Sequence, residues 1–167
     1  MNFTFERFFS AIYNARIVLI LMLMILTIMS LSMRFALAEI SPVGLWKTID
    51  DSTGRERSIV KIWKEGDVFN GKIIKILNDP RGGSDFICSE CEGELYNKPI
   101  IGLTIIRNMK KDEEKWSGGE ILDPENGIFY NATMSLDNFG KILEVRGFVG
   151  FSFFGRSQFW TKVSNIQ

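Results

Sequence analysis

The sequence predicts an all-β fold, a single antiparallel up-and-down barrel of about eight strands that follows an N-terminal signal helix. After residue 38 the chain consists of short apolar or alternating segments. Turn residues separate them at intervals of about 8–12 residues, which is typical of sandwiches and barrels. Helical periodicity is nearly absent from this region. Because most links are short, consecutive strands should pair with one another and close into a barrel.

The individual strands follow from the apolar segments and from the turns between them. The first hairpin has the short glycine-containing link Glu65-Gly66. Later turns contain Asp123-Pro124 and Asp137-Asn138, residue types that favour chain reversal. We expect strands at Val43–Asp50, Arg57–Lys64, Asp67–Leu77, Ile100–Met109, Lys115–Leu122, Gly127–Leu136, Lys141–Val149 and Arg156–Val163.

Some of these strands should be covered on both faces. Val60 and Ile62 alternate with Lys61 and Trp63, so one face of that strand should pack into a core. Residues 100–106 instead carry bulky apolar side chains at nearly every position. Such a strand is expected to be buried on two sides, and the sequence does not identify the second cover.

The first 38 residues have the parts of a secretory signal. Basic residues precede the apolar run Ile17–Met33, and the small-x-small site Ala36-Leu37-Ala38 lies before Glu39. We therefore expect residues 1–38 to be a cleaved signal peptide, residues 39–167 to form the β-barrel domain, and the protein to be exported to the periplasm. The run of 17 residues reaches the lower limit for a membrane span. An uncleaved anchor that holds the domain at the inner membrane, facing the periplasm, is the alternative.

Charge and composition exclude several classes of function. Removing Glu6, Arg7, Arg16 and Arg34 from totals of 20 acidic and 20 basic residues leaves 19 acidic and 17 basic ones. Such a balance gives no long-range attraction to nucleic acid, so we expect no nucleic-acid partner. The chain contains no histidine, which excludes histidine-dependent triads and histidine-ligated metals. We expect no catalytic, cofactor-binding or metal-binding residues, and an enzyme is the less favoured interpretation.

One carboxylate pair, Glu120 and Asp123, deserves comparison with glycoside hydrolases, which use two carboxyl groups at a defined separation. The pattern Asp123-Pro124-x-x-Gly127 is better explained as a turn, with Asp as a side-chain cap and Pro presetting the backbone. Glu120 is then an ordinary polar strand residue.

Cys88 and Cys91 lie in the long loop between the third and fourth predicted strands. A thioredoxin-like centre needs electropositive surroundings, whereas Glu90 and Glu92 are the neighbours here. A structural zinc needs four N or S ligands, and the chain has only two cysteines. We expect a disulfide that fixes the loop, which an oxidising compartment permits. Redox and metal sites are the alternatives.

The segment Gly44-Leu45-Trp46 resembles the Gly-x-Trp opening of lipocalin-like barrels. The resemblance implies that the Trp closes one end and packs against an Arg from the last strand. Here Arg156 begins the last predicted strand and Trp160 lies within it. We therefore expect Gly44, Trp46, Arg156 and Trp160 to close the barrel, with a guanidinium stacked on an indole.

A second resemblance covers almost the whole chain after residue 38. The residues that carry it include Gly44-x-Trp46, Cys88-x-x-Cys91-x-Gly93-Glu94, Asp123-Pro124-x-x-Gly127-x-x-Tyr130, Arg146-Gly147-Phe148-Val149-Gly150 and Phe154-Gly155-Arg156-x-x-x-Trp160. In these positions the chain is similar to the exported bacterial family called domain of unknown function 2147. The resemblance implies a small calycin-type β-barrel in the cell envelope, and it implies no reaction.

Four phenylalanines fall within Phe148–Phe154. We expect them to plug one end of the barrel, because Gly147, Gly150 and Gly155 permit close packing. The alternative is an exposed patch for membrane or protein contact. Apart from that patch, membrane contact is expected only through the signal or anchor segment.

Two functions agree with these observations. In the first, the barrel mouth binds a small apolar or amphipathic ligand in a pocket lined by Trp46, Trp63 and Phe148. In the second, the barrel is filled with side chains and the protein is a non-enzymatic structural or interaction module, with another envelope protein as partner. No cofactor is expected in either case.

Overall fold

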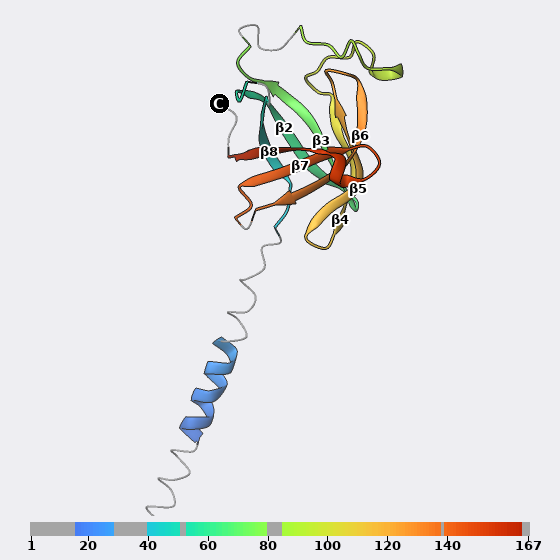
Figure 1. Cartoon of the computed structure of the whole chain (residues 1–167). Coiled ribbons are helices and arrows are strands. Elements are labelled where there is room, and N and C mark those ends of the chain that lie inside the picture. The colour runs from blue at the N-terminus through green and yellow to red at the C-terminus, as the bar shows by residue number, and fades with distance from the viewer. Residues whose placement is uncertain (1–15, 29–39, 51–52, 80–84, 138, 165–167) are drawn as a thin grey trace, which may run out of the picture. The chain divides into compact units, whose positions relative to one another are not determined.

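The computed structural model of the chain describes residues 16–28, 40–50, 53–79, 85–137 and 139–164. Within these residues the strands are β1 (Gly44–Ile49), β2 (Glu56–Glu65), β3 (Val68–Ile76), β4 (Thr104–Asp112), β5 (Lys115–Asp123), β6 (Ile128–Leu136), β7 (Ile142–Phe148) and β8 (Arg156–Val163). Neighbours are antiparallel, and β1 pairs with both β2 and β8, so the sheet closes in sequence order (Figure 1). The prediction of an eight-stranded up-and-down barrel is confirmed.

The predicted strand ends agree with the structure to within one residue, except in β4. This strand was expected at Ile100–Met109, whereas it spans Thr104–Asp112. The amide of Leu103 donates to the carbonyl of Ile100, and the amide of Gly102 donates to that of Ile73. Residues 100–103 therefore end the preceding loop, and their apolar side chains belong to that loop's packing.

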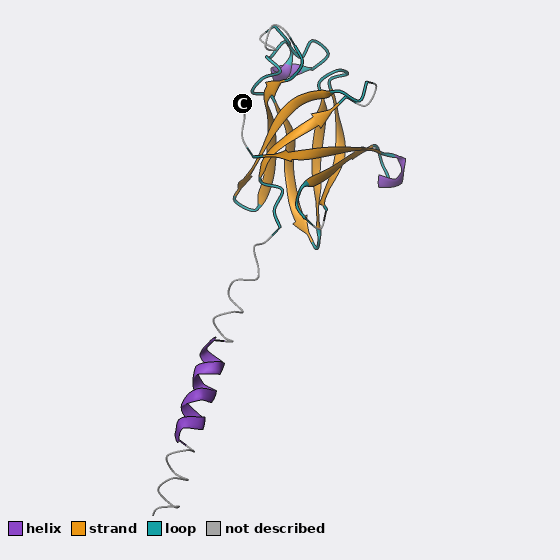
Figure 2. Cartoon of the chain, turned by 90° about the vertical axis from the view of Figure 1, so that its left-hand side faces the viewer, coloured by secondary structure: helices purple, strands orange, loops and turns teal. Residues whose placement is uncertain are grey.

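The strand connections form two ends of the barrel. The β2–β3, β4–β5 and β6–β7 turns lie with the start of β1 at what we call the closed end. The β1–β2, β3–β4, β5–β6 and β7–β8 links lie at the open end. Figure 2 shows η2 (Gly93–Leu95) in the long β3–β4 loop above the barrel. It also shows η3 (Ser152–Phe154) projecting from the side of the barrel.

Aromatic and aliphatic side chains fill the closed half of the barrel. Trp46, Trp116 and Trp160 are at most 2% exposed. The Phe69 ring meets Trp116 edge-on, with 5.9 Å between the ring centroids. The same core includes Ile62, Met109, Met134 and Leu143. Each large apolar side chain buried in this way stabilises the fold by about 1.5–3 kcal/mol.

The long β3–β4 loop packs outside the barrel wall. Ile121 lies on the inner face of β5, which places its neighbour Leu122 on the outer face, paired with Phe129 of β6. Leu122 is nevertheless only 1% exposed. Loop residues Cys88, Cys91, Ile100 and Leu103 belong to the same core cluster. The loop therefore supplies the second cover that bulky residues on both faces of these strands require.

Residues 40–167 form a folding unit of their own. The contacts of the chain divide it into Met1–Glu39 and Ile40–Gln167, and the strands, the disulfide and the core all lie in the second unit. Because every described element of the core comes from this unit, we expect the barrel domain to fold without the first 39 residues.

The N-terminal unit contains a helix over residues 16–28. Among the residues that the structure describes, no helix is long and apolar enough to cross a membrane. The predicted cleavage site at Ala36-Leu37-Ala38, before Glu39, lies outside the described residues. The signal peptide and its alternative, the anchor, therefore stay predictions.

Candidate functional site

Trp46 and Lys162 meet at the closed end of the barrel. Trp46 is fully buried, and its Nε1 donates a hydrogen bond to the Pro42 carbonyl at 2.7 Å. Lys162 pairs with Trp46 across β1 and β8, and its Nζ lies 5.4 Å from the indole ring. Gly44 leaves space for this lysine, since a Cβ there would lie 3.3 Å from Lys162 Cε. Trp160, two residues before Lys162, lies on the same face of β8 and closer to the middle of the barrel.

Arg156 is not the cation that packs on Trp46. The register pairs Arg156 with Gly147, at the opposite end of β8 from Lys162. The distance along the strand between these two basic residues is about 20 Å. The prediction that Arg156 stacks on Trp46 is therefore wrong, and Lys162 is the basic residue that lies over this indole ring.

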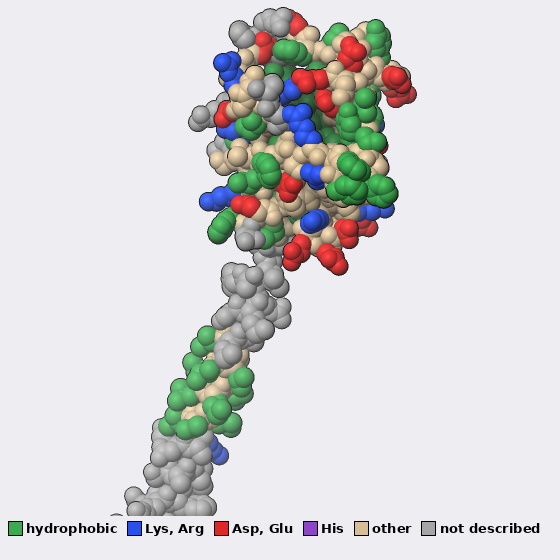
Figure 3. Space-filling view, viewed as in Figure 1, with side chains coloured by type: hydrophobic (Ala, Val, Ile, Leu, Met, Phe, Trp, Pro, Cys, Tyr) green, Lys and Arg blue, Asp and Glu red, His purple; other side chains and the backbone are tan. Residues whose placement is uncertain are grey.

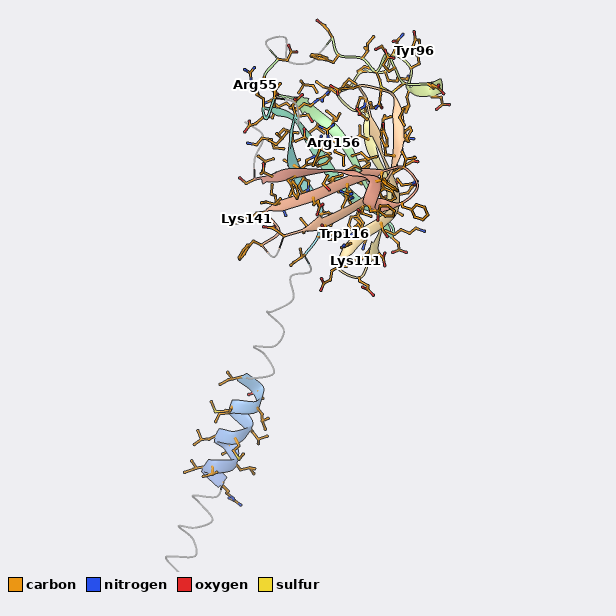
Figure 4. The ribbon with its side chains drawn as sticks, viewed as in Figure 1. Arg55, Tyr96, Lys111, Trp116, Lys141 and Arg156 are labelled. Carbon is orange, nitrogen blue, oxygen red and sulfur yellow. A yellow bond between two sulfur atoms is a disulfide. The ribbon has the colours of Figure 1, made fainter. Side chains whose placement is uncertain are left out.

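Two further lysines cover aromatic rings at the closed end. Lys64 Nζ lies 5.7 Å from the Phe69 ring, and Lys111 Nζ lies 5.4 Å from the Trp116 ring. Figure 4 labels Lys111 and Trp116 next to each other at this end. Trp116 Nε1 is the one buried side-chain nitrogen or oxygen without a hydrogen-bond partner among the described residues. Aromatic rings with lysines over them thus fill this end of the barrel.

The inner lining of the open half is only partly buried. The register places Ile121, Tyr130 and Gln158 on the inner face, because their partners there include the buried residues Ile106 and Val145. All three are half-buried, whereas the inward Trp, Met and Leu side chains of the closed half are buried. Partial exposure of these inward side chains indicates that solvent enters the barrel from the open end. Figure 3 shows a recess on this side, below the long loop, with hydrophobic side chains inside it.

Polar groups line the same half of the barrel and are hydrogen-bonded. Asn126 Nδ2 donates to the Tyr130 hydroxyl at 2.9 Å. Trp160 Nε1 donates to Gln158 Oε1 at 3.0 Å. The hydroxyls of Thr48 and Ser58 lie 2.8 Å apart, and both residues are 5% exposed. An apolar lining with a few fixed polar groups is typical of small-molecule sites.

Arg156 stands at the rim of this recess. Its partner Gly147 faces inward, since a Cβ there would lie 3.3 Å from Ile121 Cγ2 and 3.5 Å from Tyr130 Cβ. Arg156 therefore shares the inner face with these residues, and its side chain is exposed. Figure 4 labels it within the barrel outline, on the side of the long loop. A guanidinium in this position suits a carboxylate, sulfonate or phosphate group.

An ion pair crosses the open end. Arg57 Nη2 lies 2.5 Å from Glu125 Oε1 and joins β2 to the β5–β6 turn, which are on opposite walls of the barrel. Arg57 Nη1 also lies 3.7 Å from Asp50 Oδ2. Because these side chains are 27–64% exposed, the pairs are screened by solvent and are weak contacts.

The predicted pocket of Trp46, Trp63 and Phe148 does not form. Trp46 faces inward, whereas Trp63 follows the inward Ile62 and points out. Phe148 follows the inward Gly147 and also lies on the outer wall. The sequence indicates this orientation of Trp63. Val60 and Ile62 alternate with Lys61 and Trp63, so Trp63 lies on the same outer face of the strand as Lys61.

Trp63 instead lines an external groove over β1, β2 and β3. The groove has a volume of about 590 Å³, and its lining includes Leu45, Lys61, Lys72 and Ile74. Lys72 Nζ lies 5.8 Å from the Trp63 ring. This groove is separated from the recess by the barrel wall.

The Phe-rich segment does not plug the barrel. Phe151, Phe153 and Phe154 are 69–74% exposed. Arg146, on the outer face of β7, holds the loop outside: its Nε donates to the Ser152 carbonyl at 2.7 Å and its Nη2 to the Phe153 carbonyl at 3.2 Å. The predicted plug is therefore wrong, because the loop folds outward onto Arg146.

The two cysteines form the predicted disulfide, Cys88–Cys91. Both are buried, at 0% and 3% exposed, and the Cys88 amide donates to the Lys98 carbonyl at 2.9 Å. The loop sits against the β5–β6 turn, where a Cβ on Gly127 would overlap the Glu90 carbonyl at 1.9 Å. The disulfide thus fixes a loop that is packed on the barrel wall.

Glu120 and Asp123 do not face a common site. Glu120 pairs with Arg107 and Asn131 on the outer face of β5, and Asp123 lies three residues further along the strand, where side chains point the other way. Asp123 caps the turn, accepting from the Glu125 amide at 3.0 Å and from Asn126 Nδ2 at 3.2 Å. Over the described ranges, no group of three or more Cys, Asp or Glu residues is placed to hold a metal ion.

Two comparisons relate the chain to known proteins. Residues 44–162 match the model of a family described as "Uncharacterized protein conserved in bacteria (DUF2147)". No curated protein matches the chain. Among solved structures, it is similar to protein HP1028 from Helicobacter pylori, described as belonging to the lipocalin family, with a TM-score of 0.64 and 17% identity over 75% of this chain and 84% of that one. The barrel is therefore lipocalin-like, as predicted.

Proposed function

The chain belongs to the bacterial family DUF2147, and we propose that its barrel binds a small amphipathic ligand with an anionic head group at the open end. The observation that carries this proposal is the contrast between the two halves of the barrel. The large inward side chains of the closed half, Trp46, Trp116 and Leu143, are buried, whereas Ile121, Tyr130 and Gln158 of the open half are only partly buried.

The apolar part of the ligand would lie in the recess. Ile121 and Tyr130 offer it apolar contact, and Gly147 between them adds no side chain. The buried Trp160 forms the floor on the closed side, with its Nε1 already hydrogen-bonded to Gln158. The closed half is filled, so only a short apolar tail would fit, as expected for eight-stranded barrels that hold one small ligand.

The head group would bind at Arg156. This residue lies on the inner face at the rim, so a head group there leaves the tail pointing into the barrel. Charge-assisted hydrogen bonds to a guanidinium are about twice as strong as neutral ones, and they favour planar carboxylates and related anions. The exposed Arg57–Glu125 pair across the opening is weak enough to part when the ligand enters.

Dodecanoate binding to residues 40–167, measured by isothermal titration calorimetry, tests this proposal. We expect the wild-type domain to bind dodecanoate, and Arg156→Gln to weaken the affinity by about 10–100-fold, which corresponds to the roughly 1.5–3 kcal/mol of a hydrogen bond to a charged group. Dodecanol, which has no charge, should bind both proteins equally. Lys162→Gln is the matched control, since Lys162 lies on the same strand and face at the closed end. Equal affinities of wild type and Arg156→Gln for dodecanoate, or no binding at all, would contradict the proposal.

We also propose that the domain works in the periplasm after its signal has been removed. The Cys88–Cys91 disulfide supports an oxidising compartment. An uncleaved anchor at the inner membrane would expose the same barrel to the same compartment, and ligand binding does not depend on which applies.

A further inference from the structure

We propose that the β7–β8 loop, residues 149–154, is a lipid-contacting element that inserts its aromatic side chains into the surface of an anionic bilayer. We call these six residues the Phe loop. The inference is independent of ligand binding inside the barrel, because the Phe loop lies on the outer wall.

The Phe loop presents a continuous apolar surface to solvent. Val149, Phe151, Phe153 and Phe154 are 69–74% exposed. The rings touch one another, with 5.7 Å between the centroids of Phe151 and Phe153 and 4.2 Å between those of Phe153 and Phe154. Large apolar side chains that gather outside the core mark an interaction surface.

The structure holds these rings outward. Arg146 donates to the carbonyls of Ser152 and Phe153, and its Nη1 donates to Ser157 Oγ at 2.9 Å. Gly155 presses the loop against the wall, since a Cβ there would lie 2.5 Å from the Gly147 carbonyl. Two backbone carbonyls of the loop are thus held by Arg146, and its aromatic side chains are left exposed for a partner.

Shape and charge favour a lipid surface as that partner. Figure 2 shows η3, which contains Ser152, projecting clear of the barrel. A bilayer accepts a projecting apolar knob without a matching pocket, and aromatic side chains with nearby basic groups are typical of elements that lie in the membrane interface. Arg146 and Arg156 flank the loop in the sequence, and the nearby carboxylate of Glu144 accepts a hydrogen bond from Ser157 Oγ at 2.8 Å. Positive charge beside the loop is complementary to anionic head groups.

Flotation of the domain, residues 40–167, with lipid vesicles tests the inference. One set of vesicles contains phosphatidylglycerol and phosphatidylethanolamine, and the other contains phosphatidylcholine alone. We expect binding to the anionic vesicles, and we expect the double substitution Phe153→Ser and Phe154→Ser to weaken it at least tenfold. Both positions are exposed, so circular dichroism and the unfolding midpoint should stay at their wild-type values.

Phe139→Ser is the matched control. Phe139 is 83% exposed, but it lies in the β6–β7 turn at the closed end. This substitution should leave vesicle binding unchanged, and the double Phe-loop variant should still bind dodecanoate like the wild type.

Three results would overturn the inference. The wild-type domain could fail to float with anionic vesicles, the double variant could bind them as well as the wild type, or Phe139→Ser could weaken binding equally. Self-association that the double variant abolishes, without vesicle binding, would assign the loop to a second copy of the chain instead.

Discussion

At the scale of single residues, the register of the barrel decides what each basic side chain of β8 does. Arg156 and Lys162 both lie on the inner face, but they stand at opposite ends of the strand. Lys162 covers the Trp46 ring, whereas Arg156 borders the open recess. One residue therefore belongs to the closure of the barrel, and the other to its candidate binding site.

This division predicts effects of different size on stability. Lys162→Gln should lower the free energy of unfolding by about 0.5–1 kcal/mol, because it removes the cation from the Trp46 ring. Arg156→Gln should change it by less than about 0.5 kcal/mol, as expected for a substitution at an exposed position. Urea unfolding of the domain, followed by tryptophan fluorescence, measures both. If Arg156→Gln proved the more destabilising substitution, Arg156 would have a role in closing the barrel.

At the scale of elements, the disulfide loop and the barrel wall stabilise one another through a close backbone contact. Gly127 has φ +72°, a conformation that disfavours side chains, and its Cα faces the Glu90 carbonyl. Gly54 in the β1–β2 turn has nearly the same φ, +69°, but nothing lies within 4 Å of a Cβ built there. The two glycines thus differ in their contact and not in their backbone strain.

The comparison predicts how strongly the loop is attached. Gly54→Ala should cost about 1–2 kcal/mol, the strain of a left-handed residue. Gly127→Ala should cost about 1–3 kcal/mol more, because the loop must also move away from the turn. Limited proteolysis should then cut within residues 85–103 of Gly127→Ala but not of Gly54→Ala. Equal stability and equal resistance in the two variants would show that the loop is not held at Gly127.

Element boundaries were predictable where alternation and turns coincide. Seven strands follow the sequence pattern to within one residue at each end. The fourth does not, because residues 100–103 are as apolar as a strand while they pack as the end of the loop. The local sequence pattern indicates that residues 100–103 are buried. It does not show whether they are buried in a strand or in a loop that packs on the outer wall of the barrel, because that depends on tertiary packing.

The candidate site was less predictable than the fold for a related physical reason. To predict a site inside a barrel, one must know which face of each strand points inward, and a shift of the strand register by one residue reverses that face. Trp63 and Phe148 were predicted to line a pocket because they are bulky, but they point outward. Ile121 and Gln158 were not predicted as site residues, but they lie on the inner face at the recess. For the Phe loop the less favoured alternative, an exposed patch, is the one that the structure has, because the sequence does not show that Arg146 holds the loop outside.

At the scale of the whole molecule, the barrel has two unlike ends. Buried Trp46, Trp116 and Trp160 fill the closed half, whereas Ile121, Tyr130 and Gln158 of the open half are only partly buried and Arg156 beside them is exposed. The Phe loop leaves the barrel at the open end, next to the strand on which Arg156 lies. A protein that takes an amphipathic anion at a membrane surface would need both features at one end.

Ligand binding inside the barrel can be located by a nuclear magnetic resonance titration of the isotope-labelled domain, residues 40–167, with dodecanoate. We expect the chemical-shift changes to concentrate on the backbone amides of Ile121, Tyr130, Gly147 and Gln158 and on the Trp160 indole, all at or below the open-end recess. Changes confined to Leu45, Trp63 and Ile74 would place the ligand in the external groove instead. That result, or a spectrum that does not change, would contradict ligand binding inside the barrel.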